Sequence, residues 1–532
     1  MSHSQGSGVL SCANVLPPGS DSAGWIIGES TPSRSMILFK PQVKPRNGMY
    51  LLVETSEGCV LGIVERVLSG HAILGDKIRE AEELQAITRY PDFRDKIYRV
   101  GIVQWVSLLD PLLKARVRSP STPPDPGAEA YTAPGSVLQA AFQGSGQEWI
   151  PIGHLVSDPS VTVSVNVNRL TRHLAILAVT GGGKSNTVCV LAKRIVGSLN
   201  GTMVVFDIHG EYALARPPLA GDKLTSVKQP VIKPFALSFP ELRKLARIPD
   251  NAHVQERILR EAWKKLMEDW RKGNLAGKLS QKKGFLELLK TYASAVGGKY
   301  KDSLLGLLNR LDDMEDYYGN VIDSSAPPRL EDYIEPGKLN IIDLSNVDEY
   351  AADAVVSHYL RRLLEERKQW KATGGQKGYP VPVLAVVEEA HVLIPSKDDT
   401  LTKYWAARVA REGRKFGVGL ILVSQRPKNV DQDVLSQTNN KIILRIVEPQ
   451  DQRYVQAASE QLSEDLMTLL PSLNPGEAII LGGMTRIPAM VKIDKCPVQT
   501  GGADIDIVRE WMSGSQPKPE GEEDLEEVSE LF

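Results

Sequence analysis

The stretch HLAILAVTGGGKSN, at residues 173–186, constrains the fold of this chain more than any other. An apolar run at 173–179 predicts a buried strand, and a helix-compatible segment follows the glycines and extends to about Leu199. Backbone N–H groups of a glycine turn can surround a phosphate, a lysine can reach the outer phosphates, and a serine hydroxyl can ligate Mg²⁺. We therefore predict a P-loop that binds ATP and Mg²⁺ through Thr180, Gly181, Gly182, Gly183, Lys184, Ser185 and Asn186, with Ser185 on the metal.

The loop departs from the usual P-loop pattern at one position. That pattern has a glycine five residues before Gly183, where this chain has Ala178. The alternative is a glycine turn with an incidental lysine, which the strand before the loop and the helix after it make less favourable.

Composition limits the class of protein. A length of 532 residues predicts two or three domains, and a net charge of −2 requires that any nucleic-acid contact use a local patch or a channel built from several subunits. Cys12, Cys59, Cys189 and Cys496 are widely spaced without a CxxC pair, so we expect neither a zinc site nor a disulfide framework. No apolar run approaches the roughly 20 residues of a membrane span, and we expect a cytoplasmic protein without a membrane partner.

Changes in composition along the chain predict its domain boundaries. Short apolar runs separated by glycine and proline before residue 150 predict a small closed β-barrel. Helical periodicity dominates from about 236 to 335, and the last residues are acidic. The predicted order is a flexible arm (1–21), a β-barrel (22–150), an ATPase core (151–235 and 336–512) interrupted by a helical insertion (236–335), and an acidic tail (513–532).

The core is predicted to be α/β. Near-continuous apolar runs such as MVVFDI and LNIIDL alternate with helical patterns, which is typical of a parallel-rich sheet covered by helices on both faces. Within the insertion, residues 251–301 hold twelve basic and five acidic residues, whereas 302–335 hold two and nine. These halves can pair with each other or with a neighbouring subunit, and solvated helix faces are favoured over DNA binding.

Two acids end one of the apolar strands, in VLAVVEEAH. Glu388 occupies the position associated with Mg²⁺, and Glu389 that of the catalytic base. Gln425, at the end of the next strand, is placed to sense the γ-phosphate or the attacking water. Asp207, in FDIHGEY, either holds water or the lysine near the phosphates or forms a plain turn.

The segment WAARVAREGRKFG carries arginines at every third position. Arg408, Arg411 and Arg414 drift slowly around one side of a helix. One interpretation is a solvated or salt-bridged helix that includes Glu412. The other inserts an arginine into the ATP site of a neighbouring subunit, where it stabilises charge on the transferred phosphoryl group.

Taken in order, AVTGGGKSNTV, FDIHGEY, VVEEAHVLIP, REGRKFG and SQRP resemble the HerA family of hexameric DNA translocases. The resemblance covers roughly residues 20–510 and implies a barrel followed by a RecA-like core. It implies that Glu389 polarises water, that Arg414 acts in trans and that Arg172 acts on nucleotide in cis. It further implies a homohexamer on double-stranded DNA that works with a NurA-like nuclease in DNA end resection and recombinational repair.

In RecA-like cores, the loops after the acid strand and the next strand face the central channel. Here these loops, at about 395–403 and 426–434, carry Lys397, Lys403, Arg426, Lys428 and Asn429. We predict that these residues track DNA phosphates without reading bases, the alternative being ordinary surface loops.

Two other functions remain open at the level of sequence. One is a motor related to the ATPases of conjugation and type IV secretion, and the other is a nucleotide-gated scaffold that recruits a nuclease. The presence of Lys184, Glu389 and Gln425 argues against an inactive ATPase.

Overall fold

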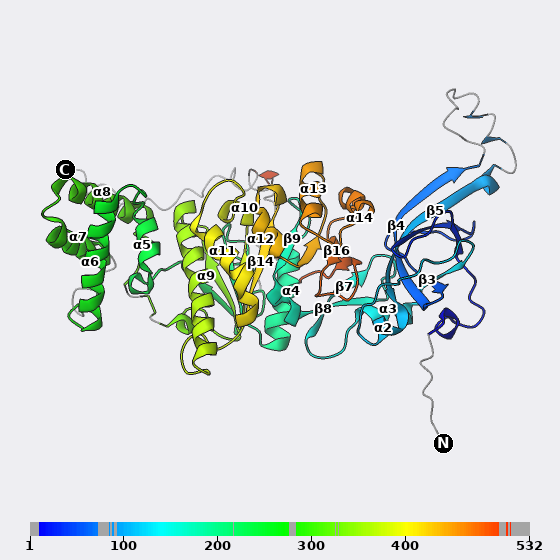
Figure 1. Ribbon diagram of the computed structural model, residues 1–532, viewed down its shortest axis with the longest axis horizontal. Helices are drawn as coiled ribbons and strands as arrows, with labels where there is room; N and C mark the ends of the chain where they lie inside the picture. The colour runs from blue at the N-terminus through cyan, green and yellow to red at the C-terminus, as the bar shows by residue number, and fades with distance from the viewer. Residues whose placement is uncertain are drawn as a thin grey trace, which may run out of the picture.

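The computed structural model describes residues 10–498, except 73–83, 86–87, 90–92, 216–217, 276–283, 325 and 328, together with residues 507, 508 and 511. A helical module, an α/β core and a β-barrel follow one another along the long axis of the molecule (Figure 1). Residues 1–9 of the predicted arm and the predicted tail at 513–532 lie outside the described residues. Within the described part of the chain, no helix combines the length and apolar character needed to cross a membrane.

Six antiparallel strands close the N-terminal barrel in the order β1-β2-β5-β4-β3-β6. They are β1 (Gly24–Ile27), β2 (Arg34–Phe39), β3 (Tyr50–Thr55), β4 (Gly58–His71), β5 (Ile97–Leu108) and β6 (Glu129–Thr132). Buried side chains that include Ile37, Val64 and Trp105 give the barrel an apolar core of its own. The small helix α2 (Leu109–Leu113) lies between β5 and β6, and α3 (Gly135–Phe142) lies between the last barrel strand and β7 of the ATPase core.

The segment at 10–21 is attached to the barrel and is not the flexible arm that we expected. The backbone N–H of Cys12 donates to Glu54 Oε2 at 2.6 Å, and Cys12 forms a disulfide with Cys59 on β4. A second disulfide joins Cys189 to Cys496. Our expectation that the cysteines are unpaired was therefore wrong, because the partners lie 47 and 307 residues apart and only the fold brings them together.

The core contains an eleven-stranded mixed sheet in the order β11-β12-β10-β13-β14-β9-β15-β16-β17-β7-β8. Neighbouring strands are parallel from β11 to β15 and antiparallel from β15 to β8, so the parallel-rich α/β prediction is confirmed. The strands are β7 (Trp149–Leu155), β8 (Thr162–Asn166), β9 (Leu174–Leu177), β10 (Met203–Asp207), β11 (Thr225–Lys228), β12 (Leu339–Asp343), β13 (Val383–Val387), β14 (Val418–Ser424), β15 (Asn440–Ile443), β16 (Glu477–Leu481) and β17 (Ala489–Ile493).

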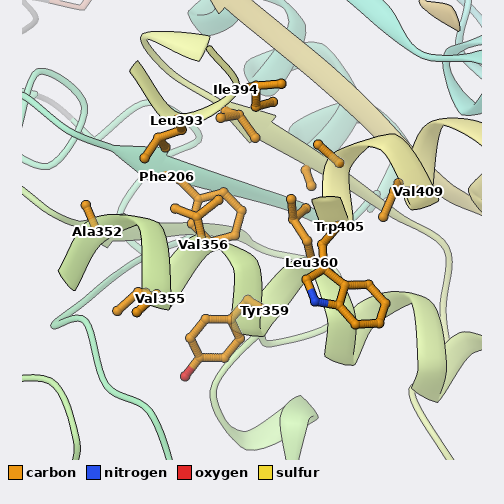
Figure 2. Close-up of a cluster of buried hydrophobic side chains, with 14 of the residues drawn as sticks. Phe206, Ala352, Val355, Val356, Tyr359, Leu360, Leu393, Ile394, Trp405 and Val409 are labelled. Carbon is orange, nitrogen blue, oxygen red and sulfur yellow. The ribbon is translucent and has the colours of Figure 1, made fainter. Parts of the chain in front are cut away.

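Both faces of this sheet are buried. On β13, Ala385 belongs to one apolar core, whereas its neighbour Val386 belongs to the other, because successive side chains of a strand point to opposite faces. Helix α4 (Lys184–Leu199) covers one face, and α9 (Glu349–Ala372) and α11 (Leu401–Glu412) cover the other. Figure 2 shows the apolar core that contains Ala385, where α9 packs beside Phe206 and Trp405.

The remaining helices form the insertion and short connections. The insertion contains α5 (Phe239–Leu245), α6 (His253–Arg271), α7 (Gly284–Gly297) and α8 (Lys301–Tyr318) and lies at the end of the molecule away from the barrel (Figure 1). Lys290 of α7 contacts Asp312 and, at 3.0 Å, Glu315 of α8, so the basic and acidic halves do meet within one chain. The connecting helices are α10 (Ala390–Leu393), α12 (Gln432–Gln437), α13 (Pro449–Ala457) and α14 (Glu464–Leu469).

Candidate functional site

The predicted P-loop lies between β9 and α4, and α4 begins at Lys184. Gly181 and Gly183 have φ angles of 73° and 107°, a left-handed conformation that glycine adopts without strain. At Gly182, an added Cβ would lie 2.8 Å from the Cβ of Ala178. The alanine that replaces the usual glycine is therefore accommodated because Gly182 has no side chain.

A cavity lies at the carboxyl ends of β9, β10, β13 and β14, which meet at one edge of the sheet because these strands are parallel. Its lining brings together most of the residues that the sequence predicted, although Gly182 is not among them. The lining residues are Thr180, Gly181, Gly183, Lys184, Ser185, Asn186, Asp207, His209, Glu211, Tyr212, Glu388, Glu389 and Gln425.

Glu389 has the environment of a general base. It follows β13 with φ 43° and ψ 49°, a conformation that is uncommon outside glycine and that is often found at functional sites. Its Oε2 atom lies 3.1 Å from Nδ1 of His391 and has no regular hydrogen-bond partner among the described residues. Burial acts to raise the pKa of Glu389, but His391, Lys184 and His209 outweigh burial and hold that pKa below its ordinary value. An ionised carboxylate can accept a proton from water.

Glu388 has a different environment, although it is the adjacent residue. Only 8% of it is exposed, and its Oε1 atom accepts a hydrogen bond from the Tyr212 hydroxyl. Burial is the main cause that raises the pKa of Glu388 to about 8, and the Tyr212 hydrogen bond opposes this rise. A buried carboxyl group that is already hydrogen-bonded is poorly suited to the metal-ligand role that we predicted for Glu388.

Asp207 forms the turn of the HGEY segment, in agreement with the simpler of its two predicted roles. Its carboxylate accepts the backbone N–H groups of Glu211 at 3.1 Å and of Tyr212 and Ala213 at 2.9 Å each. Burial raises the pKa of Asp207 to about 6, and the hydrogen bonds from Ala213 and Tyr212 limit the rise. Glu211 and Tyr212 were not predicted as site residues, although their place just after a strand-ending aspartate was a usable signal.

Two predicted polar residues make hydrogen bonds that define their roles. The Thr180 hydroxyl donates to Gln425 Oε1 at 2.5 Å, which connects the P-loop to the end of β14. The Asn186 side chain donates to Asp494 O and accepts from Cys496 N, both at 2.8 Å. The Asn186 amide is thus committed to the segment after β17, although the residue lines the cavity.

The two predicted catalytic arginines lie at the opposite edge of the sheet. Arg172 precedes β9 and Arg414 precedes β14, whereas the P-loop and Gln425 follow those same parallel strands. Burial, together with the charges of Arg414 and Arg169, lowers the pKa of Arg172, which reflects the proximity of these guanidinium groups. Our expectation that Arg172 acts on the nucleotide of its own chain is therefore not supported, because the length of β9 separates it from the P-loop.

The predicted DNA-contacting loops lie side by side. A β-bridge joins Pro395 to Val430, and the backbone N–H of Ser396 donates to Asn429 O at 2.8 Å. The cations on these loops divide into two groups. Lys397 and Arg426 are exposed, whereas Lys403 contacts Asp431 at 3.4 Å and Lys428 contacts Glu448 at 3.5 Å.

The donor atoms around the P-loop fit Mg²⁺, which prefers oxygen ligands. Ser185 offers a hydroxyl, and Glu211 and Glu389 offer carboxylates around the same cavity. Among the described residues, no group of three or more His, Cys, Asp or Glu side chains is arranged to hold a metal ion alone. A cation here would therefore be held jointly by Ser185 and by the phosphates of a nucleotide.

A glycine loop that opens a helix, with a lysine, a serine and a facing carboxylate at the ends of parallel strands, defines a P-loop ATPase. The families described as "Helicase HerA, central domain" and "Helicase HerA-like C-terminal" match residues 150–363 and 335–494. The chain belongs to the HerA helicase family, as the sequence motifs predicted. It is accordingly an ATP-hydrolysing helicase or translocase.

Two relatives with known names agree with this assignment. The chain is 40% identical, over 498 residues, to the DNA double-strand break repair helicase HerA of Sulfurisphaera tokodaii, covering 93% of this chain and 97% of that protein. It is also 40% identical to the protein of the same name from Saccharolobus solfataricus, covering 92% of this chain and 95% of that protein. VirB4 of Thermoanaerobacter pseudethanolicus is structurally similar with a TM-score of 0.48 and 16% identity, covering 66% of this chain and 98% of that one.

Proposed function

We propose that this chain is an ATP- and Mg²⁺-dependent motor that moves along double-stranded DNA as a homohexameric ring. We further propose that it works with a NurA-like nuclease in the resection of DNA ends for recombinational repair. The names of its relatives, which are DNA double-strand break repair helicases, support the DNA substrate.

One structural observation carries the ring proposal. Lys184 and Glu389 line one cavity, whereas Arg172 and Arg414 lie together at the opposite edge of the same sheet. In a closed ring, the arginine edge of one subunit can face the cavity of the next. Each ATP site is then completed by the arginines of a neighbour, so hydrolysis depends on assembly.

The residues of the cavity have separate tasks in hydrolysis. The P-loop amides and Lys184 bind the phosphates, and Glu389 takes a proton from the attacking water while Gln425 orients that water. Bound Mg²⁺, held through Ser185 beside the phosphates, would neutralise part of their charge. An arginine supplied in trans contributes about 10³- to 10⁵-fold to the rate of such reactions.

The proposed DNA path uses the exposed cations of the two adjoining loops. Lys397 and Arg426 are free to reach phosphates. Lys403 and Lys428 contribute less because each is paired with an acid, Asp431 and Glu448 respectively, and Asn429 contributes less because its backbone holds the two loops together. In the double variant Lys397→Ala with Arg426→Ala, we expect DNA stimulation of ATPase activity to fall more than in Lys403→Ala. Equal stimulation in the two variants would contradict the proposal that these loops contact DNA.

The experiment that tests the function compares ATP hydrolysis with and without duplex DNA and measures the native mass. We expect a hexamer whose turnover rises with DNA, and turnover that is lost in Lys184→Ala because the phosphates lose their cation. Turnover without DNA stimulation would favour a motor like those of conjugation or type IV secretion. Nucleotide binding without turnover would favour a nucleotide-gated scaffold that recruits the nuclease.

A further inference from the structure

The HGEY turn after β10 holds two side chains in fixed directions. Asp207 accepts three consecutive N–H groups of this turn, at residues 211–213, so the backbone there has little freedom. Gly210, with φ 72°, packs against Ser345, where an added Cβ would lie 3.3 Å from the Ser345 Cβ. The turn therefore directs Glu211 and Tyr212 into the cavity as a rigid unit.

Glu211 contacts the serine of the P-loop directly. The Ser185 hydroxyl donates a hydrogen bond to Glu211 Oε2 at 2.6 Å. An ionised carboxylate can only accept, so the single hydroxyl proton of Ser185 points toward Glu211. The lone pairs of Ser185 Oγ are then free to face a cation on the phosphate side.

Tyr212, the second side chain of the turn, contacts Glu388. Its hydroxyl donates to Glu388 Oε1, and both residues are buried. Glu211 is half-buried and lines the cavity beside the P-loop. The same turn thus engages Glu388 through the Tyr212 hydroxyl and places Glu211 beside Ser185.

We propose that Glu211 is a positioning residue for Mg²⁺, which keeps the lone pairs of Ser185 Oγ directed at the cation by accepting its hydroxyl proton. This inference rests on the proposed use of Mg²⁺-bound ATP and adds to it the residue that orients the serine. Carboxylates that orient a metal ligand through a hydrogen bond typically change metal affinity by about 10- to 100-fold.

Equilibrium binding of ADP, measured by titration calorimetry with Mg²⁺ and with EDTA, tests the proposal without relying on turnover. The quantity of interest is the Mg²⁺ enhancement, which is the ratio of the two dissociation constants. In Glu211→Gln we expect the enhancement to fall about tenfold or more, with unchanged affinity in EDTA, because the phosphate-binding groups remain. Glu211→Asp keeps the charge and should recover part of the enhancement.

Glu388→Gln is the matched control. It removes a carboxylate from the same cavity, and we expect it to keep the wild-type Mg²⁺ enhancement because Tyr212 already occupies that carboxyl group. Thermal unfolding of each variant shows whether it is folded, and the Glu211→Asp arm decides the question if Glu211→Gln is not. An unchanged enhancement in the Glu211 variants, or an equal loss in Glu388→Gln, overturns the proposal. Failure of the wild-type chain to bind ADP would instead contradict the proposed function.

Discussion

His173, at the start of the P-loop strand, has a backbone conformation that is unusual for its type. Its φ and ψ angles are 65° and 153°, a region occupied almost only by glycine. Two contacts hold it there: Nδ1 accepts the N–H of Leu420 at 3.0 Å, and its carbonyl accepts the Asn440 amide at 2.9 Å. Because Arg172 is the preceding residue, this conformation fixes the direction of the Arg172 backbone relative to β9.

The environment of His173 predicts a pH dependence of stability. Burial lowers the pKa of His173 to about 4, below its ordinary value of 6.5 in the unfolded chain. As the pH falls from 7 to 5, the unfolded chain takes up a proton that the folded chain does not, so stability falls by about 2 kcal/mol. Thermal unfolding at both pH values should show a smaller loss in His173→Gln than in the wild type. An equal loss in the two proteins would mean that His173 does not titrate in this way.

At the scale of elements, strands and helices were the predictable part of the fold. The core strands β9, β13 and β14 lie where continuous apolar runs placed them, and α4 ends at Leu199 as expected. The chain order of a strand, glycines, Lys184 and Ser185 was sufficient for the phosphate-binding part of the candidate site, because these groups are adjacent in sequence.

The contacts that the sequence did not predict join residues far apart in the chain. Tyr212 and Glu388 are 176 residues apart, and their hydrogen bond occupies the Glu388 carboxyl group. Asn186 and Asp494 are 308 residues apart, and their contact engages the side-chain amide of a predicted nucleotide ligand. Residue types alone do not show which distant side chains will meet, because that depends on how the strands assemble.

Helix α4 is tied to the end of the core by three kinds of contact. Asn186 makes its two hydrogen bonds to the segment after β17, Arg194 lies 3.3 Å from Asp494, and Cys189 is bonded to Cys496. These contacts hold the last segment of the core against the helix that carries the P-loop.

The disulfide of α4 is expected to stabilise the core. Closing a loop of 307 residues restricts the unfolded chain, and such bonds are typically worth about 2–4 kcal/mol. Cys189→Ser should lower the unfolding temperature of the core, and added reductant should then have no further effect on that transition. Cys12→Ser is the control, since it removes the barrel disulfide and should leave the core transition in place. A core transition that responds equally to both changes would contradict this assignment.

At the scale of the whole molecule, the proposed ring implies that each chain carries two halves of an ATP site at opposite edges of one sheet. Lys184 and Glu389 line the cavity, and Arg172 and Arg414 lie at the other edge. Under the proposed function, a single chain therefore has a complete set of these groups but cannot use them on one nucleotide.

Mixing variants tests this arrangement. Lys184→Ala lacks a functional P-loop, and Arg414→Ala lacks the arginine, so each homo-oligomer should be inactive or nearly so. In mixed rings, the P-loop of an Arg414→Ala subunit can face the intact arginines of a Lys184→Ala subunit, and ATPase activity should reappear. Activity is measured after the two proteins are mixed under conditions that allow exchange of subunits. No recovery, despite mixed rings in native mass measurements, would contradict a trans arginine.

The strand order of the core has a consequence for synthesis on the ribosome. The barrel strands are all near neighbours between residues 24 and 132, so the barrel can fold as soon as it emerges. Strand β9, by contrast, lies between β14 and β15, whose residues begin at 418 and 440, and β7 pairs with β17 at 489–493. A nascent chain thus carries its P-loop through more than half of its translation before the sheet around it can close, and it acquires the ability to bind nucleotide only near the end of synthesis.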